Sequence, residues 1–84
     1  MYVDRYGNVH TNVAPEQVAQ FGDKLKFASN AKTQQIPIVR TFGDVNEHEP
    51  ALVIDDVGLM SVIVNQGSAS QLFQLHNGDT FTIS

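Results

Sequence analysis

Five carboxylates and one histidine are concentrated in residues 43–56, a stretch that contains no lysine or arginine. The acidic side chains are Asp44, Glu47, Glu49, Asp55 and Asp56. Side chains of these types can hold a metal ion, act as an acid–base pair, or present negative charge to a partner protein. Each kind of chemistry requires its own spacing of the groups, so the spacing decides among them.

The spacing within this stretch does not favour a metal site. Glu47, His48 and Glu49 are consecutive, and neighbouring side chains of an extended chain point in opposite directions. The chain has no cysteine, and its other two histidines are expected in separate hairpins. Residues 44–49 lack the register and the glycine of a calcium-binding loop. The sequence therefore predicts no metal and no cofactor.

Hydrolytic chemistry is not predicted either. Asp55 and Asp56 are adjacent, and adjacent strand residues project to opposite faces, whereas a catalytic carboxylate pair faces one gap. No serine lies in a Gly-x-Ser-x-Gly context, and no glycine-rich phosphate loop is present. A Ser-His-Asp arrangement stays open, because the chain contains all three residue types. The sequence predicts a non-catalytic protein, with a small hydrolase or a metal-binding protein as the less favoured interpretation.

The charges are divided unevenly along the chain. Residues 1–42 carry all five basic residues and three acids, whereas residues 43–84 carry six acids and no base. Five bases are few for neutralising phosphates, so direct nucleic-acid binding is not expected. An acidic surface instead complements a basic protein surface. This pattern favours a small acidic interaction module, of inhibitor or adaptor type, that docks on a basic surface of a larger protein.

The predicted contact surface of such a module is the acidic stretch itself. Its partner-binding residues would be Asp44, Glu47, Glu49, Asp55 and Asp56, with Tyr2, Tyr6 or Phe42 as aromatic anchors. Compact single-domain proteins of this kind are typical of viruses and mobile elements, which is an analogy from size and charge. The alternative function is a structural subunit that self-assembles through its edge strands.

The chain length of 84 residues suits one domain, residues 1–84, with a single small core. Because disulfides are excluded, self-association is the expected source of further burial, and we predict a homodimer. The first ten residues contain no apolar run of the kind found in a signal peptide, and no run is long enough to span a membrane. These features predict a soluble, cytoplasmic protein that does not bind membranes.

The acidic stretch must be positioned by the strands around it. The segment LMSVIVN is separated from it by two residues, has no charge, and is rich in β-branched residues, which predicts the central strand of a sheet. The segment ALVID predicts a second strand, and IPIVRTF a third, with Pro37 typical of an edge. Residues 2–11 predict a hairpin that turns at Gly7-Asn8, and residues 71–84 a second hairpin that turns at Asn77-Gly78.

Pro15 and Glu16 predict the start of a short helix over residues 15–21, which Gly22 ends. The next segment, KLKFA, is either a strand with Leu25 and Phe27 inward or the continuation of the helix, and we favour the strand. Tight turns and short spacings favour antiparallel pairing. The sequence therefore predicts a β-rich α+β domain, a small twisted sheet or open barrel of about five to seven short strands with one short helix. An all-β sandwich or barrel is the alternative.

Overall fold

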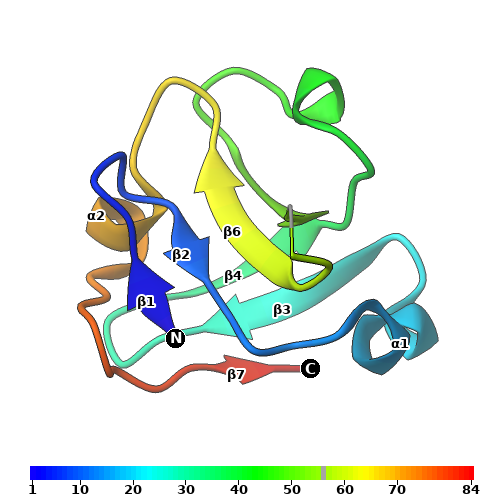
Figure 1. Ribbon diagram of the computed structural model, residues 1–84, viewed down its shortest axis with the longest axis horizontal. Coiled ribbons are helices and arrows are strands. Elements are labelled where there is room, and N and C mark those ends of the chain that lie inside the picture. The colour runs from blue at the N-terminus through cyan, green and yellow to red at the C-terminus, as the bar shows by residue number, and fades with distance from the viewer. Residues whose placement is uncertain (56) are drawn as a thin grey trace.

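The computed structural model describes residues 1–55 and 57–84, apart from the side chain of Phe42. In this part of the chain, seven strands form two antiparallel sheets (Figure 1). One sheet has the order β1-β2-β6-β5 and consists of Tyr2–Val3, Val9–His10, Met60–Val64 and Pro50–Ile54. The other has the order β4-β3-β7 and consists of Thr33–Pro37, Lys24–Ala28 and Thr82–Ile83. The predicted β-rich α+β class is therefore confirmed.

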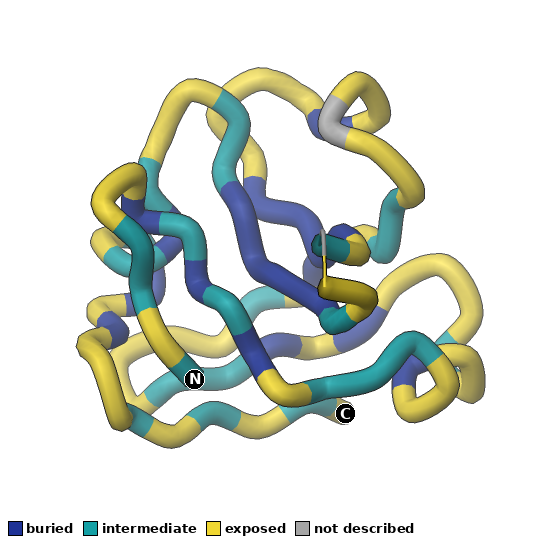
Figure 2. The backbone as a smooth tube through the Cα atoms, viewed as in Figure 1, coloured by how far each residue is buried: buried dark blue, intermediate teal, exposed yellow. Residues whose placement is uncertain are grey.

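The main core lies between the two sheets. Leu25 and Phe27 of β3 alternate with exposed lysines and pack against apolar residues of the other sheet, among them Leu52 and Val62. Figure 2 shows that the buried backbone is concentrated in the strands. Phe27 is fully buried, and its ring centroid lies 4.8 Å from that of Phe73 in an edge-to-face contact. Burial of these aromatic and aliphatic side chains supplies most of the stabilisation available to so small a domain.

The four-stranded sheet is also covered on its outer face. Val45, Ala51, Val53 and Ile63 form a second buried cluster there. Successive residues of β5 and β6 thus point alternately into two cores, which explains why their sequences are apolar without interruption. The predicted central strand is confirmed, because β6 lies between β2 and β5.

The N-terminal helical turn also follows the prediction. α1 (Pro15–Val18) begins with a proline and continues into the 3-10 helix η1 (Ala19–Phe21). The side chain of Gln17 accepts a hydrogen bond of 2.8 Å from the backbone N–H of Ala14. Gly22 then adopts a φ of 77° and redirects the chain into β3, so the strand interpretation of this segment is correct. Throughout the described part of the chain, no helix is long and apolar enough to cross a membrane.

The predicted C-terminal hairpin is wrong. The residues before its expected turn form the helix α2 (Ala69–Phe73), in which Ser68 Oγ accepts a hydrogen bond of 3.2 Å from the N–H of Gln71. The return strand β7 pairs with β3, far away in sequence, and not with its neighbour. The physical reason for the helix is that it lets Phe73 pack against Phe27. The local alternation of apolar residues does not reveal this contact.

The third predicted strand is shifted along the sequence. β4 begins at Thr33 and ends at Pro37, where the expected strand had only begun. Its edge position is confirmed, because β4 is an outer strand of its sheet. The chain then passes to the other sheet, where Val39 N donates to Leu52 O over 2.9 Å, and forms the 3-10 helix η2 (Phe42–Asp44).

Candidate functional site

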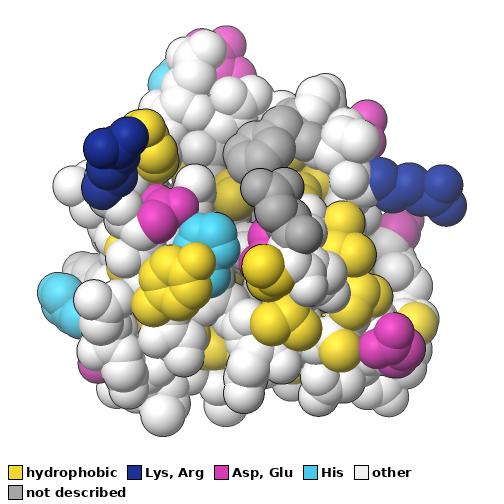
Figure 3. Space-filling view, viewed as in Figure 1, with side chains coloured by type: hydrophobic (Ala, Val, Ile, Leu, Met, Phe, Trp, Pro, Cys, Tyr) yellow, Lys and Arg dark blue, Asp and Glu magenta, His cyan; other side chains and the backbone are white. Residues whose placement is uncertain are grey.

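A hollow of about 560 Å³ opens on the outer side of the four-stranded sheet. It is lined by residues from β1, β2, β5, β6 and the connections around them: Tyr2, Asn8, His10, Arg40, Thr41, Val53, Ile54, Asp55, Val57, Ser61 and Ile63. Three lining residues, Tyr2, Ile54 and Val57, are large hydrophobic side chains exposed to solvent. Figure 3 shows this combination, with a histidine beside hydrophobic and acidic side chains on the face toward the viewer. Hollows of this size and mixed lining are typical of small-molecule sites.

His10 links the residues of this hollow. Strand pairing places it opposite Ser61 of β6 and Tyr2 of β1. Its Nδ1 lies 3.1 Å from Ser61 Oγ and 3.5 Å from Asp55 Oδ2, and its Nε2 lies 2.8 Å from Asp4 Oδ2. The ring of Tyr2 stacks on the imidazole. His10 is therefore held both by its own hairpin, through Tyr2 and Asp4, and by the distant β5–β6 hairpin, through Ser61 and Asp55.

Asp4 occupies the turn between β1 and β2. Its carboxylate accepts hydrogen bonds from the backbone N–H groups of Tyr6 (2.9 Å) and Asn8 (3.0 Å) and from the side chain of Asn8 (3.2 Å). Burial raises the pKa of Asp4, but the hydrogen bonds from His10 and from these groups together hold it below its usual value. The carboxyl is consequently ionised at neutral pH and fixes both Asn8 and His10.

Asp55 plays the same part in the turn between β5 and β6. Its carboxylate accepts hydrogen bonds from the N–H groups of Val57 and Leu59, each 3.0 Å long, and from the hydroxyl of Ser61 over 3.1 Å. Burial raises its pKa, but the backbone and side-chain donors outweigh burial and lower the pKa overall. The hollow thus has the ionised carboxylate of Asp55 in its lining, and the carboxylate of Asp4 contacts His10 from outside the lining.

The Ser-His-Asp combination left open by the sequence does occur here, in Ser61, His10 and Asp4. It is not built as a nucleophilic triad, because Ser61 is only 2% exposed and its hydroxyl is therefore out of reach of a ligand. Both ring nitrogens of His10 already have partners, so no nitrogen is free to accept a proton from a ligand hydroxyl. The arrangement is suited to recognising charge and shape in a ligand.

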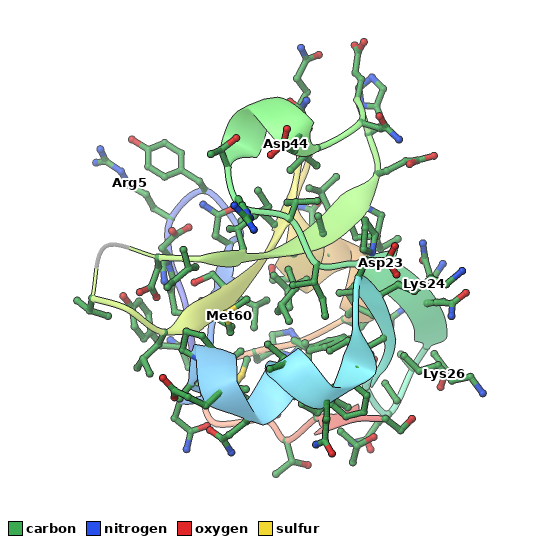
Figure 4. All side chains as sticks on the ribbon, turned by 90° about the vertical axis from the view of Figure 1, so that its right-hand side faces the viewer. Arg5, Asp23, Lys24, Lys26, Asp44 and Met60 are labelled. Carbon is green, nitrogen blue, oxygen red and sulfur yellow. The ribbon has the colours of Figure 1, made fainter. Side chains whose placement is uncertain are left out.

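Of the five acidic residues singled out from the sequence, the four that the structure describes are not brought together. Asp55 faces the hollow, whereas Asp44 lies in η2, within 3.2 Å of Thr41 Oγ1. Glu47 and Glu49 are exposed on the connection to β5, and Asp56 lies outside the described residues. Figure 4 shows that Asp44 and Lys24 lie on separate parts of the surface. Partner binding by this acidic group stays a prediction.

No pattern in the sequence marks Tyr2, Asp4 and His10 as a connected group. A local signal existed, because His10 follows the buried Val9 in a strand and so had to face the other side of the sheet. The partner strand β6 lies 51 residues away at the Ser61 contact, and no local pattern reveals such a pairing. Within residues 1–55 and 57–84, no group of three or more His, Cys, Asp or Glu side chains is arranged so that it could hold a metal ion.

Comparison with protein families gives a match over almost the whole chain. The model of a family described as the SAM hydroxide adenosyltransferase C-terminal domain matches residues 1–82. The (R)-S-adenosyl-L-methionine hydrolase of Thermus thermophilus is 33% identical over 75 residues, which cover 89% of this chain and 27% of the hydrolase. The chain thus spans about a quarter of the length of that relative.

Two solved structures have a similar fold. An uncharacterized conserved protein from Thermotoga maritima aligns with a TM-score of 0.88 and 29% identity, over 98% of this chain and 33% of that one. A conserved hypothetical protein from Thermus thermophilus aligns with a TM-score of 0.70 and 30% identity, over 98% of this chain and 32% of that one. In both, the similar region is about a third of a longer chain.

These matches overturn the prediction of a non-catalytic protein. An adenosyltransferase family and a related hydrolase indicate an enzyme family, so the interpretation as an inhibitor or adaptor, and the analogy with viral proteins, are wrong. The uneven charge distribution suggested that interpretation, but it describes only the surface of one domain. Chemistry that a domain performs together with other parts of an enzyme leaves no such signature in its net charge.

Proposed function

Because this chain belongs to the SAM hydroxide adenosyltransferase C-terminal domain family, we propose that its hollow forms one wall of a site for S-adenosyl-L-methionine. The reaction is transfer of the adenosyl group to hydroxide. The hydroxide oxygen bonds to C5′ of the ribose, the bond from C5′ to sulfur breaks, and its electron pair stays on sulfur. The products are adenosine and methionine.

The observation that supports this proposal is the mixed lining of the hollow on the outer side of the four-stranded sheet. Tyr2, Ile54 and Val57 offer apolar and aromatic surface of the kind that accommodates a flat purine. Asp55 offers a carboxylate to an ammonium or sulfonium group, and Arg40 offers a guanidinium to a carboxylate. S-adenosyl-L-methionine contains all of these groups.

The hollow is one-sided, since three of its rim residues remain exposed. A reaction at a sulfonium centre that must exclude bulk water needs a second wall. We propose that the second wall and the groups that activate hydroxide come from another domain. The match to only 27% of the related hydrolase is consistent with such a division of labour.

A homodimer and a cytoplasmic location stay predictions. The dimer is checked by the mass of the chain in size-exclusion chromatography with light scattering, measured over a range of concentrations. A mass that stays at that of one chain throughout would contradict it.

Binding can be tested directly by ¹⁵N NMR, because the method detects weak binding to a domain of this size. Titration with S-adenosyl-L-methionine should shift the amide signals of residues that line the hollow, including Asn8, His10 and Asp55. Methionine alone should produce smaller shifts, because it lacks the purine. Signals that stay in place, or that move only outside the hollow, would contradict the proposal.

A matched pair of variants sharpens the test. Asp55→Asn removes a charge from the hollow and should weaken binding roughly fivefold. Asp79→Asn removes a carboxylate that also accepts a backbone hydrogen bond, from His76 N over 2.8 Å, but does not line the hollow. The Asp79→Asn variant should bind S-adenosyl-L-methionine as tightly as the unmodified chain does. Equal weakening by both variants would attribute the effect to net charge and not to the hollow.

A further inference from the structure

His10 is the titratable group around which the charges of the hollow are arranged. Among the described residues, the ionisable groups facing it are Asp4 from the β1–β2 turn, Asp55 from the β5–β6 turn and the phenol of Tyr2 from β1. Arg40 lines the same hollow from the segment after β4. Histidine changes its charge between about pH 5 and pH 8, whereas the carboxylates and the guanidinium keep theirs.

The net charge of this group therefore depends on His10. Two carboxylates and one guanidinium leave one net negative charge when the imidazole is neutral. When the imidazole is protonated, the same four groups have no net charge. A single proton thus changes the hollow from one that attracts a cation to one that does not.

The hydrogen bonds keep both ring nitrogens of His10 paired in either state. In the neutral state Asp55 Oδ2 gives up its bond from Ser61, while Asp55 Oδ1 keeps its two backbone donors. In the imidazolium, Nε2–H donates to Asp4 and Nδ1–H donates to Ser61 Oγ, whose hydroxyl donates to Asp55. In the neutral ring, Nε2–H still donates to Asp4, and the hydroxyl of Ser61 turns to donate to Nδ1. Rotation of one hydroxyl is enough to pass between the states, so His10 can change its charge while the fold stays as it is.

We propose that His10 is a specificity-determining residue of the hollow, which favours a sulfonium cation over its neutral thioether when the imidazole is neutral and loses that preference when the imidazole is protonated. This inference rests on the proposed function, because it requires that the ligand occupies the hollow. It adds a basis for distinguishing substrate from products, since neither adenosine nor the thioether of methionine has the sulfonium charge. One unit charge at contact distance near water corresponds to roughly a fivefold change in affinity.

The experiment compares two ligands that differ in the sulfonium charge. S-adenosyl-L-methionine has this charge, and S-adenosyl-L-homocysteine lacks both it and the sulfonium methyl group. The affinity of the 84-residue chain for each is measured by ¹⁵N NMR from about pH 5.5 to about pH 8, and the ring signals of His10 are followed over the same range. We expect the affinity for S-adenosyl-L-methionine to rise roughly fivefold with pH. The rise should follow the change in the ring signals of His10, and the homocysteine analogue should bind equally throughout.

Two variants identify the residue responsible. His10→Gln keeps a side-chain donor toward Asp4 but cannot change its charge, so the pH dependence should disappear. His76→Gln removes a histidine that is outside the hollow, with its side chain 85% exposed, and the pH dependence should remain. A pH dependence that persists in His10→Gln, or that is the same for both ligands, would overturn the inference while leaving the proposed function intact. Failure of both ligands to bind at any pH would instead refute the proposed function, and the inference with it.

Discussion

The ring of Tyr2 lies parallel to the imidazole of His10, with the centroids 4.6 Å apart and the planes inclined by 10°. The two residues are direct partners across the β1–β2 pair, so the strand register brings the rings together. Tyr2 covers one face of the titratable ring and at the same time forms part of the rim of the hollow. Through this contact, the residue that shapes the rim of the hollow, Tyr2, also touches the residue whose protonation sets the charge of the hollow, His10.

Replacement of Tyr2 tests that coupling. Tyr2→Ala should weaken binding of S-adenosyl-L-methionine several-fold, because it removes both the rim surface and the stacking on His10, whereas Tyr2→Phe should retain most of the affinity. The free energy of unfolding should fall by only about 0.5–1.5 kcal/mol in Tyr2→Ala, the range of an aromatic pair. NMR titration and urea denaturation measure the two effects. Loss of affinity in Tyr2→Phe as well would assign the effect to the hydroxyl.

Asp4 should contribute to stability through its hydrogen bonds. Asp4→Asn exchanges an acceptor of four hydrogen bonds for an amide that can accept at only one oxygen, and we expect the free energy of unfolding at pH 7 to fall by about 1–2 kcal/mol. Asp44→Asn is the matched control, because the Asp44 side chain accepts a single bond, from the exposed Thr41. Urea denaturation should leave this control close to the unmodified chain. An equal loss in both variants would point to a general effect of charge.

Acid should destabilise the fold through Asp4 and Asp55. Both have a pKa in the folded state below the usual value of 3.8, so the folded chain binds these protons less readily than the unfolded chain does. Their contribution is therefore complete above pH 3.8 and is lost as the pH falls through the lowered values. Thermal melts at decreasing pH should show this loss. The double variant with Asp4→Asn and Asp55→Asn should show a flatter dependence, and an unchanged slope would contradict the assignment.

Gly7 should tolerate no side chain. Its φ is 84°, and a Cβ added there would lie 2.6 Å from Ser68 Cβ, so Gly7→Ala combines backbone strain with a steric clash. Gly22→Ala isolates the first effect, because φ is 77° there and nothing lies within 4 Å of the added atom. We expect Gly22→Ala to lower the free energy of unfolding by about 1–2 kcal/mol and Gly7→Ala by clearly more. Equal losses in urea denaturation would show that the contact with Ser68 can adjust.

The fold class could be predicted because its signals are local. Gly22 ends the first helix because of its backbone preference. Leu25 and Phe27 alternate with lysines because β3 has one face to bury, and β5 and β6 have apolar runs because both of their faces are buried. The helix α2 could not be predicted in this way. Leu72, Phe73 and Leu75 fit a strand about as well as one turn of helix, and the contact of Phe73 with Phe27 decides between them.

Of the residues singled out from the sequence, Asp55 and Tyr2 line the hollow. Asp55 belongs to the acidic stretch that local composition singles out, but His10 and Asp4 meet it only because β2 pairs with β6. The exposed acids Glu47 and Glu49 belong to the same stretch but lie outside the hollow. Composition reports how many charges a chain has, whereas strand pairing decides which of them face one another.

The pairing of β3 with β7 bears on how the chain folds as it is made. Lys26 and Ser84 exchange two backbone hydrogen bonds, of 2.9 and 3.0 Å, so the three-stranded sheet cannot close until Ser84 has left the ribosome. Leu25 and Phe27 emerge long before Phe73, which covers one of them. The apolar face of β3 and β4 therefore stays uncovered until residues 73–84 have emerged, and closure of this sheet depends on contacts between segments that are distant in the sequence.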